Sequence, residues 1–322
     1  GGNSGLAIDT GLVPPQSAIP PSVRRLDPSV TNFFTDTFDA LEIWIESTRS
    51  GLATDFFGRN LGDYFNLLNQ GILRTAVADS DTHKRITTQS GGPRTMVASP
   101  TDDPGALGGI AETLSANVNA GRAFGTNGPI VRITTSAAST GQVGGLELGL
   151  PTLINTTDGA VDVNFEIQSP IWAEFDRIEI YVNSTTTRSV ASKQSGAGLV
   201  SVKSYTTTPD FVLDAGTDFT INTVNVVPSV PGALRLEATA TLSLTGLTQD
   251  AWIVALIRGR DGVSRPLFPV VPNDLKSAGN TTLADLTDGN LGENGIMAMA
   301  FTNPLFVDVD GGGWTAPGLQ IN

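Results

Sequence analysis

Strict alternation of apolar and polar residues is the feature of this 322-residue sequence that most constrains its fold. The alternation occurs at residues 161–167, 178–182, 234–244 and 252–258. Because successive side chains of a strand point to opposite faces, this pattern predicts strands with one face in a core. Turns rich in Gly, Pro and Asn separate these stretches, without a convincing helix between them. Residues 129–322 are therefore predicted to form an antiparallel β-sandwich domain.

Residues 36–128 have a different pattern, which indicates an α/β domain. Short apolar runs predict buried strands, and longer stretches with apolar residues on one side predict helices. The expected strands are residues 38–45, 72–78 and 94–98, and the expected helices lie at 60–70 and within 102–120. Asp102 or Asp103 is expected near the start of the second helix, with Pro104 in its first turn.

Residues 1–35 are rich in Gly and Pro and lack any period, which predicts an extended N-terminal arm. The sequence begins Gly1-Gly2-Asn3, without Met. Proteolytic maturation, including removal of a signal segment, is one interpretation, and an edited sequence start is the other. On either interpretation, we expect coding sequence upstream of Gly1.

Charge and composition argue against several classes of partner. The formal net charge of −13 opposes binding to nucleic acid and opposes a basic membrane-binding face. No stretch approaches about 20 apolar residues, so no membrane span is expected. The absence of Cys excludes disulfides and thiolate metal ligands. A charged content of only 16%, together with many Thr residues, favours a secreted protein with an extracellular or periplasmic location.

His83 is the only histidine, and it lies two residues after Asp81 at the end of the predicted strand 72–78. Ligands of α/β proteins gather at the carboxyl ends of strands, and a carboxylate beside an imidazole can bind a divalent metal. A catalytic zinc needs about three protein ligands, so Asp81 and His83 form an incomplete site. The alternative interpretation is a lone histidine in a polar loop.

Several short motifs in one order resemble a known family. They are Asp39-Ala40-Leu41-Glu42, residues 63–71, Ser80-Asp81-Thr82-His83, Gly92-Pro93-Arg94-Thr95, residues 120–129 and residues 300–310. Together they resemble the C-terminal half of a CehA/McbA-type metallohydrolase of the PHP (polymerase and histidinol phosphatase) superfamily. The resemblance implies that residues 36–128 are the C-terminal half of a PHP-like domain, a partial distorted (β/α) barrel, followed by the sandwich.

The resemblance also implies a chemistry. Such enzymes use a cluster of divalent metals to hydrolyse phosphoester, carbamate or related bonds, and Asp81 and His83 match two of their metal ligands. The family's earlier histidine ligands have no counterpart here, because His83 is the only histidine. We therefore expect Zn or Mn to bind only if a companion segment, the upstream half of the same precursor, supplies the missing ligands. This chain alone is expected to be inactive.

Five further residues are candidates for supporting roles around Asp81 and His83. Asp39, Glu42 and Asp79 lie on or beside the predicted strands, where each could hydrogen-bond a metal ligand or make a structural bond. Arg94 could hold an anionic substrate or stabilise the start of its strand. Asn127 is a turn residue or a residue of the cleft.

The C-terminal sequence offers a second candidate metal site. Asp308 and Asp310 precede Gly311-Gly312-Gly313, and alternating carboxylates before glycines are typical of calcium loops. The twelfth position of that pattern is Leu319 and not a Glu, so the match is partial.

Three functions remain open from the sequence. The first is the C-terminal portion of a secreted metal-dependent hydrolase. The second is a processed, non-catalytic subunit of an extracellular homopolymeric assembly, in which exposed sheet edges pair with identical subunits. The third is a carbohydrate- or surface-binding module using Trp172, Trp252 and Trp314, of which Trp252 is expected to be buried.

Overall fold

The computed structural model of the protein describes residues 38–45, 56–80, 92–195, 198–230, 232–260, 262–265, 267 and 297–319. The helices are α1 (Phe56–Asn69), the 3-10 helix η5 (Pro104–Ile110) and α2 (Ala111–Asn119). The strands are β1 (Ala40–Ile45), β2 (Thr75–Asp79), β3 (Arg94–Val97), β4 (Ala123–Thr126), β5 (Ile130–Ala137), β6 (Gln142–Gly145), β7 (Leu153–Asn155), β8 (Val161–Pro170), β9 (Arg177–Val182), β10 (Thr186–Ser195), β11 (Gly198–Thr207), β12 (Phe211–Asp214), β13 (Ile221–Asn225), β14 (Leu234–Leu244), β15 (Ala251–Arg258), β16 (Met299–Thr302) and β17 (Leu305–Asp308).

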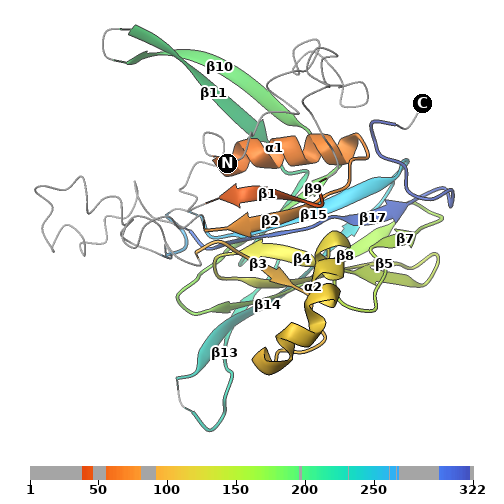
Figure 1. Ribbon diagram of the computed structural model, residues 1–322, viewed down its shortest axis with the longest axis vertical. Helices are drawn as coiled ribbons and strands as arrows, with labels where there is room; N and C mark the ends of the chain where they lie inside the picture. Colours follow the sequence, from red (N-terminus) through yellow and green to blue (C-terminus); the bar gives the residue numbers. More distant parts are fainter. Residues whose placement is uncertain are drawn as a thin grey trace, which may run out of the picture.

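Two sheets packed face to face form the centre of the described structure (Figure 1). The larger sheet has the order β12-β9-β15-β16-β4-β3, with β17 paired to β15 and β7, and the smaller has the order β13-β14-β8-β5-β6. Alternate residues of both sheets meet in one core, where Phe165 of β8 lies with Ile180 of β9 and Ile253 of β15. This arrangement is the β-sandwich that the alternation predicts.

A third layer covers the outer face of the larger sheet, and it consists of α1 and the parallel pair β1–β2 (Figure 1). The Phe65 ring of α1 lies 4.7 Å from the Trp252 ring of β15, measured between centroids. The Trp44 ring of β1 lies 5.8 Å from Phe57 and 6.3 Å from Phe301. Aromatic side chains bury large apolar areas, so these contacts fix the third layer on the sandwich. They also bury Trp252 completely, as expected.

The predicted partial (β/α) barrel is wrong. The described residues contain one β–α–β unit, β1–α1–β2, which matches the strands and helix expected at 38–45, 60–70 and 72–78. The third expected strand, β3, does not continue that parallel pair, because it pairs antiparallel with β4 in the larger sheet. Strands from both predicted halves of the chain thus share one sheet, and the described structure is mostly β.

Side chains explain why the parallel pair stops at β2. The side-chain amide of Asn303 makes the two hydrogen bonds to Ala76 that the backbone of a neighbouring strand would make. Its Oδ1 accepts from Ala76 N at 2.7 Å, and its Nδ2 donates to Ala76 O at 3.0 Å. The Thr95 hydroxyl does the same for Ala78, accepting from its N and donating to its O, both at 2.9 Å. Because the Asn303 amide and the Thr95 hydroxyl of β3 satisfy the outer edge of β2, β3 meets β2 through a side chain and not through a backbone ladder.

The helix expected within 102–120 is present as η5 followed by α2. Asp103 Oδ1 accepts from Gly105 N at 2.9 Å and Pro104 opens the first turn, so the start of this segment is as expected. Among the described residues, no helix has the length and apolar character needed to cross a membrane.

The Asn303 side chain predicts a large stability effect. It is fully buried and also accepts from Tyr64 Oη at 3.1 Å and donates to Ala123 O at 2.8 Å. Asn303→Leu leaves these buried partners unsatisfied, so we expect the free energy of unfolding in urea to fall by about 3–5 kcal/mol. The exposed control Asn119→Leu should change it by less than about 0.5 kcal/mol. Equal effects of the two variants would contradict the pairing role of Asn303.

Candidate metal centre

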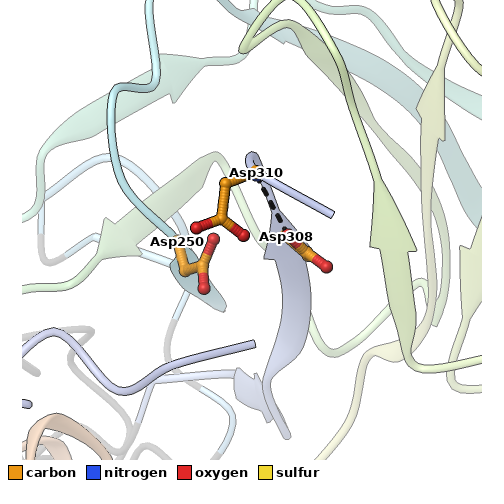
Figure 2. A group of neighbouring side chains, drawn as sticks. All are labelled: Asp250, Asp308 and Asp310. Carbon is orange, nitrogen blue, oxygen red and sulfur yellow. Dashed lines mark hydrogen bonds between the residues drawn. The ribbon is translucent and has the colours of Figure 1, made fainter. Parts of the chain in front are cut away.

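Three aspartates converge where β15 and β17 end. Asp250 directly precedes β15, Asp308 is the last residue of β17 and Asp310 lies two residues further. β15 and β17 are antiparallel neighbours with Ala251 opposite Val307, and this register brings Asp250 beside the end of β17. One carboxylate oxygen of each aspartate lies within 4.8 Å of the other two. Figure 2 shows the side chains of Asp250 and Asp310 pointing toward one another.

Asp250 is a buried hydrogen-bond acceptor for the C-terminal loop. Its Oδ1 accepts from Val309 N at 2.9 Å, and its Oδ2 accepts from Thr315 N at 2.7 Å. Its backbone carbonyl accepts from Asn183 Nδ2 at 2.9 Å. Both ends of the loop that follows β17 are therefore tied to the start of β15.

Asp308 is held by backbone amides of the same loop. Its Oδ1 accepts from Asp310 N at 3.0 Å and from Gly311 N at 2.7 Å, and its Oδ2 accepts from Gly313 N at 2.8 Å. Burial alone would raise the pKa of Asp308, but the amides of Gly313, Gly311 and Asp310 favour the charged form and bring this pKa below its usual value. Asp308 is therefore ionised at neutral pH.

The glycines explain how the loop can fold around these acids. Gly311 and Gly313 have φ values of 76° and 90°, a region that side chains with a Cβ rarely adopt. Their amides can thus turn inward, while Gly312 N donates to Asp310 Oδ1 at 2.7 Å. Asp310 itself is exposed, so the cluster opens to solvent on its side.

The donors fit a hard divalent cation. Carboxylate oxygens are the ligands that Ca²⁺ and Mg²⁺ prefer, whereas zinc sites use imidazole or thiolate in addition. Asp308 and Asp310 form no ion pair within the described part of the chain, so amide dipoles alone balance these two charges there. Three carboxylates provide part of the six to eight oxygens around Ca²⁺, and water would supply the rest. In the absence of a cation, the same amide bonds make the cluster a loop anchor.

The sequence predicted two members of this cluster and missed the third. Asp308 and Asp310 belong to the calcium-like motif, whereas Asp250 follows Gln249 without any motif. Only the pairing of β15 with β17 brings Asp250 to the site. The only sequence signal for Asp250 was its position as an acidic residue directly before an alternating apolar stretch.

The other predicted metal ligands, Asp81 and His83, lie outside the described residues. Asp79 is exposed and is the last residue of β2. Asp39 is also exposed, but it lies at the opposite end of the parallel pair. Its backbone carbonyl there accepts a hydrogen bond from Thr75 N, the first residue of β2. The structure therefore does not bring Asp39 and Asp79 together. Glu42 is half-buried in the middle of β1, opposite Val77.

Arg94 and Asn127 have different environments. Arg94 is exposed at the start of β3, opposite Thr126 of β4. Asn127 is buried, where its Nδ2 donates to Met297 O at 2.9 Å and its Oδ1 accepts from Met299 N at 2.7 Å. The Asn127 amide thus pairs with the backbone leading into β16.

The tryptophans do not form an aromatic platform. Trp252 is buried, and Trp314 packs against Phe306 with ring centroids 4.7 Å apart while its Nε1 donates to Ala251 O at 3.1 Å. Trp172 is exposed in the turn after β8. Trp252 and Trp314 contribute to the core between the larger sheet and the third layer, whereas Trp172 is exposed away from them, so the three side chains give the carbohydrate-binding hypothesis no shared exposed surface.

No family model matches this chain, and neither the curated proteins nor the solved structures gave a match. The resemblance to CehA/McbA-type metallohydrolases therefore stays a prediction that depends on the sequence motifs.

The lowered pKa of Asp308 predicts an acid-dependent loss of stability. Its folded pKa lies below the unfolded value of about 3.9, so the stabilisation is complete above that pH and disappears as the pH falls through the folded pKa. We expect Asp308→Asn to lower the free energy of unfolding at pH 7 by about 2 kcal/mol. The difference in the free energy of unfolding between Asp308→Asn and the unmodified chain should be smaller near pH 2.

Urea unfolding of both proteins at the two pH values measures this difference. Glu112→Gln, at an exposed position of α2, is the control and should behave like the unmodified chain. A deficit of the same size at both pH values would show that the charge of Asp308 is not its source.

Proposed function

We propose that this chain is a non-catalytic structural module whose β-sandwich is stabilised by a hard divalent cation, Ca²⁺ in the first place. The observation that carries this proposal is the convergence of Asp250, Asp308 and Asp310 within 4.8 Å at the ends of two central strands. Like charges this close repel each other, and a bound divalent cation reverses the sign of that interaction.

The cation would act on the C-terminal loop. Residues 309–313 connect β17 to Trp314. The indole of Trp314 packs against Phe306, and its Nε1 donates a hydrogen bond to the carbonyl of Ala251, the first residue of β15. Bringing the three carboxylates to one ion would hold this loop against the sandwich. Extracellular calcium modules bind with dissociation constants of about 0.1–1 mM, so such a site would suit a secreted location.

The titration behaviour of the described carboxyl groups supports a structural role. Where their pKa values are shifted, all shifts are downward, at Asp158, Glu174, Asp214 and Asp308. A carboxyl group that donates a proton in catalysis at neutral pH needs a raised pKa. Hydrogen bonds and, at Glu174 and Asp214, arginines instead favour the charged form of these four acids, as in Arg177–Asp214 at 2.8 Å.

Calcium addition to the chain should raise its thermal stability. Binding to the folded state alone adds about 2.7 kcal/mol at a ligand concentration of 100 Kd. We expect a saturable calorimetric titration with Ca²⁺ and a rise in Tm of several degrees. Both should be lost in Asp310→Asn, whose side chain is exposed and accepts a hydrogen bond from Gly312 N that an amide oxygen can also accept, so the fold should persist.

Glu112→Gln removes one exposed negative charge elsewhere and is the matched control, which should keep the response. No titration heat and no change in Tm with either Ca²⁺ or Mg²⁺ would contradict the proposal. An unchanged response in Asp310→Asn would contradict the assignment of the site.

Metal-assisted hydrolysis of phosphoester or carbamate-like bonds is a second candidate function. Its support is the sequence resemblance together with one structural observation: β2 is a parallel strand that ends at Asp79, two residues before Asp81. The carboxyl end of a parallel strand is where α/β proteins place ligands. Asp81 and His83 would need further donors from the upstream half of the same precursor to hold Zn or Mn.

This second candidate predicts that the 322-residue chain alone has no turnover. Pure chain with added Mn²⁺ or Zn²⁺ should leave an activated phosphoester unhydrolysed, because two donors are too few for a catalytic site. Turnover that disappears in His83→Ala would contradict the prediction and would also overturn the non-catalytic proposal.

A further inference from the structure

β13 (Ile221–Asn225) is an outer strand of the smaller sheet, and among the described strands it pairs only with β14. The hairpin continues beyond the sheet, since Val226 N donates to Ala233 O at 2.7 Å. In Figure 1 this hairpin projects from the body of the sandwich at the lower end of the view. One backbone edge of β13 is thus not paired with any other strand of the described residues.

Within the described structure, the β13 edge lacks the protection that outer strands usually carry. Charged residues, bulges and covering segments normally prevent edge-to-edge pairing. Residues 219–234 contain no Asp, Glu, Lys, Arg or His, in a chain with a net charge of −13. The register from Ile221 opposite Ala238 to Asn225 opposite Leu234 runs without a bulge.

Exposed aliphatic side chains extend this uncharged edge. In the loop between β13 and β14 and at its end, Val226, Val227, Val230 and Leu234 are 45%, 40%, 52% and 40% exposed. Single exposed aliphatics are normal, but a group of them at one hairpin tip marks an interaction site. The edge of β13 and the hairpin tip together form an apolar, hydrogen-bonding strip.

A comparison with another outer strand sharpens the contrast. β12 also has exposed apolar residues, Phe211 and Val212, but Asp210 precedes it and Asp214 ends it. Two copies that pair through β12 would have to bury Asp210 and the Arg177–Asp214 ion pair beside their counterparts, which costs desolvation. The strip at β13 lacks this obstacle.

We propose that β13 is a self-association edge, on which β13 of a second copy of this chain pairs in antiparallel orientation. Such a contact is isologous, so an uncharged strand is complementary to itself. Two copies of charge −13 can approach most closely through a surface without charge. The two smaller sheets would become one continuous sheet, with Asn225 of each strand opposite the half-buried Ile221 of the other and the two Thr223 residues facing each other.

This proposal is independent of the cation site. Asp250, Asp308 and Asp310 lie at the ends of strands of the larger sheet, whereas β13 belongs to the smaller sheet. A cationic partner protein would favour the acidic surface and not this uncharged strip. Binding of another polypeptide at β13 is therefore the competing outcome of the test.

Sedimentation velocity of the full chain at increasing concentration tests the proposal. We expect a monomer–dimer equilibrium that strengthens with added NaCl, because salt screens the repulsion between acidic copies. Thr223→Lys places a charge at the exposed central residue of β13 and should weaken dimerisation at least tenfold. The control Val212→Lys, on β12, should leave the dimer unchanged.

Cysteine cross-linking provides a second readout that does not depend on the lysine variant. The chain has no cysteines, so Thr223→Cys introduces a single thiol at the centre of β13. Directly opposed residues of an antiparallel pair have Cα atoms about 4.5–5.5 Å apart, within the range of a disulfide. Oxidation should yield a covalent dimer, and Val212→Cys should not.

A chain that stays monomeric at all concentrations would overturn the proposal. A dimer that resists Thr223→Lys and forms no Thr223→Cys cross-link would assign self-association to another surface and overturn it equally. Neither result bears on calcium binding, which is read separately by calorimetry.

Discussion

β15 is buried on both of its faces, and the described structure is arranged around it. Ile253, Ala255 and Ile257 point into the sandwich core, while Trp252, Val254 and Leu256 point toward α1 and the β1–β2 pair. A strand covered on both sides can join three layers, because each set of alternate residues contributes to a different core. The same strand pairs with β9, β16 and β17 and begins directly after Asp250. The position of the candidate metal centre is thus a consequence of how this strand is paired, because Asp250 meets Asp308 through the β15–β17 register.

The second constraint is the use of side chains as strand substitutes. Asn303 and Thr95 complete the backbone hydrogen bonds of Ala76 and Ala78, so that a parallel pair can lie against a mostly antiparallel sheet without joining it. This arrangement satisfies buried peptide groups that a third strand would otherwise satisfy. It also joins the chain around residue 76 to the turn between β16 and β17, far away in the sequence.

The period of the apolar residues along the sequence explains which parts of this fold could be predicted. Alternation over Val161–Pro170 and Leu234–Leu244 depends only on local burial, and these strands lie where the pattern indicates. The partner of a strand is not encoded in its own period. Nothing in Arg94–Val97 indicates whether it extends a parallel pair or joins β4, and the expected barrel failed at that point. Asp250 was missed for the same reason, because its neighbours at the site come from residues 308 and 310.

A crystal structure of the whole chain grown with CaCl₂, or with Tb³⁺ as an anomalous substitute, tests the cation site most directly. The account predicts one anomalous peak about 2.3–2.6 Å from carboxylate oxygens of Asp250, Asp308 and Asp310, with the loop after β17 in the conformation described. The contradicting result is an ordered loop without such a peak, in which the carboxylates accept only the amide hydrogen bonds of residues 309–315.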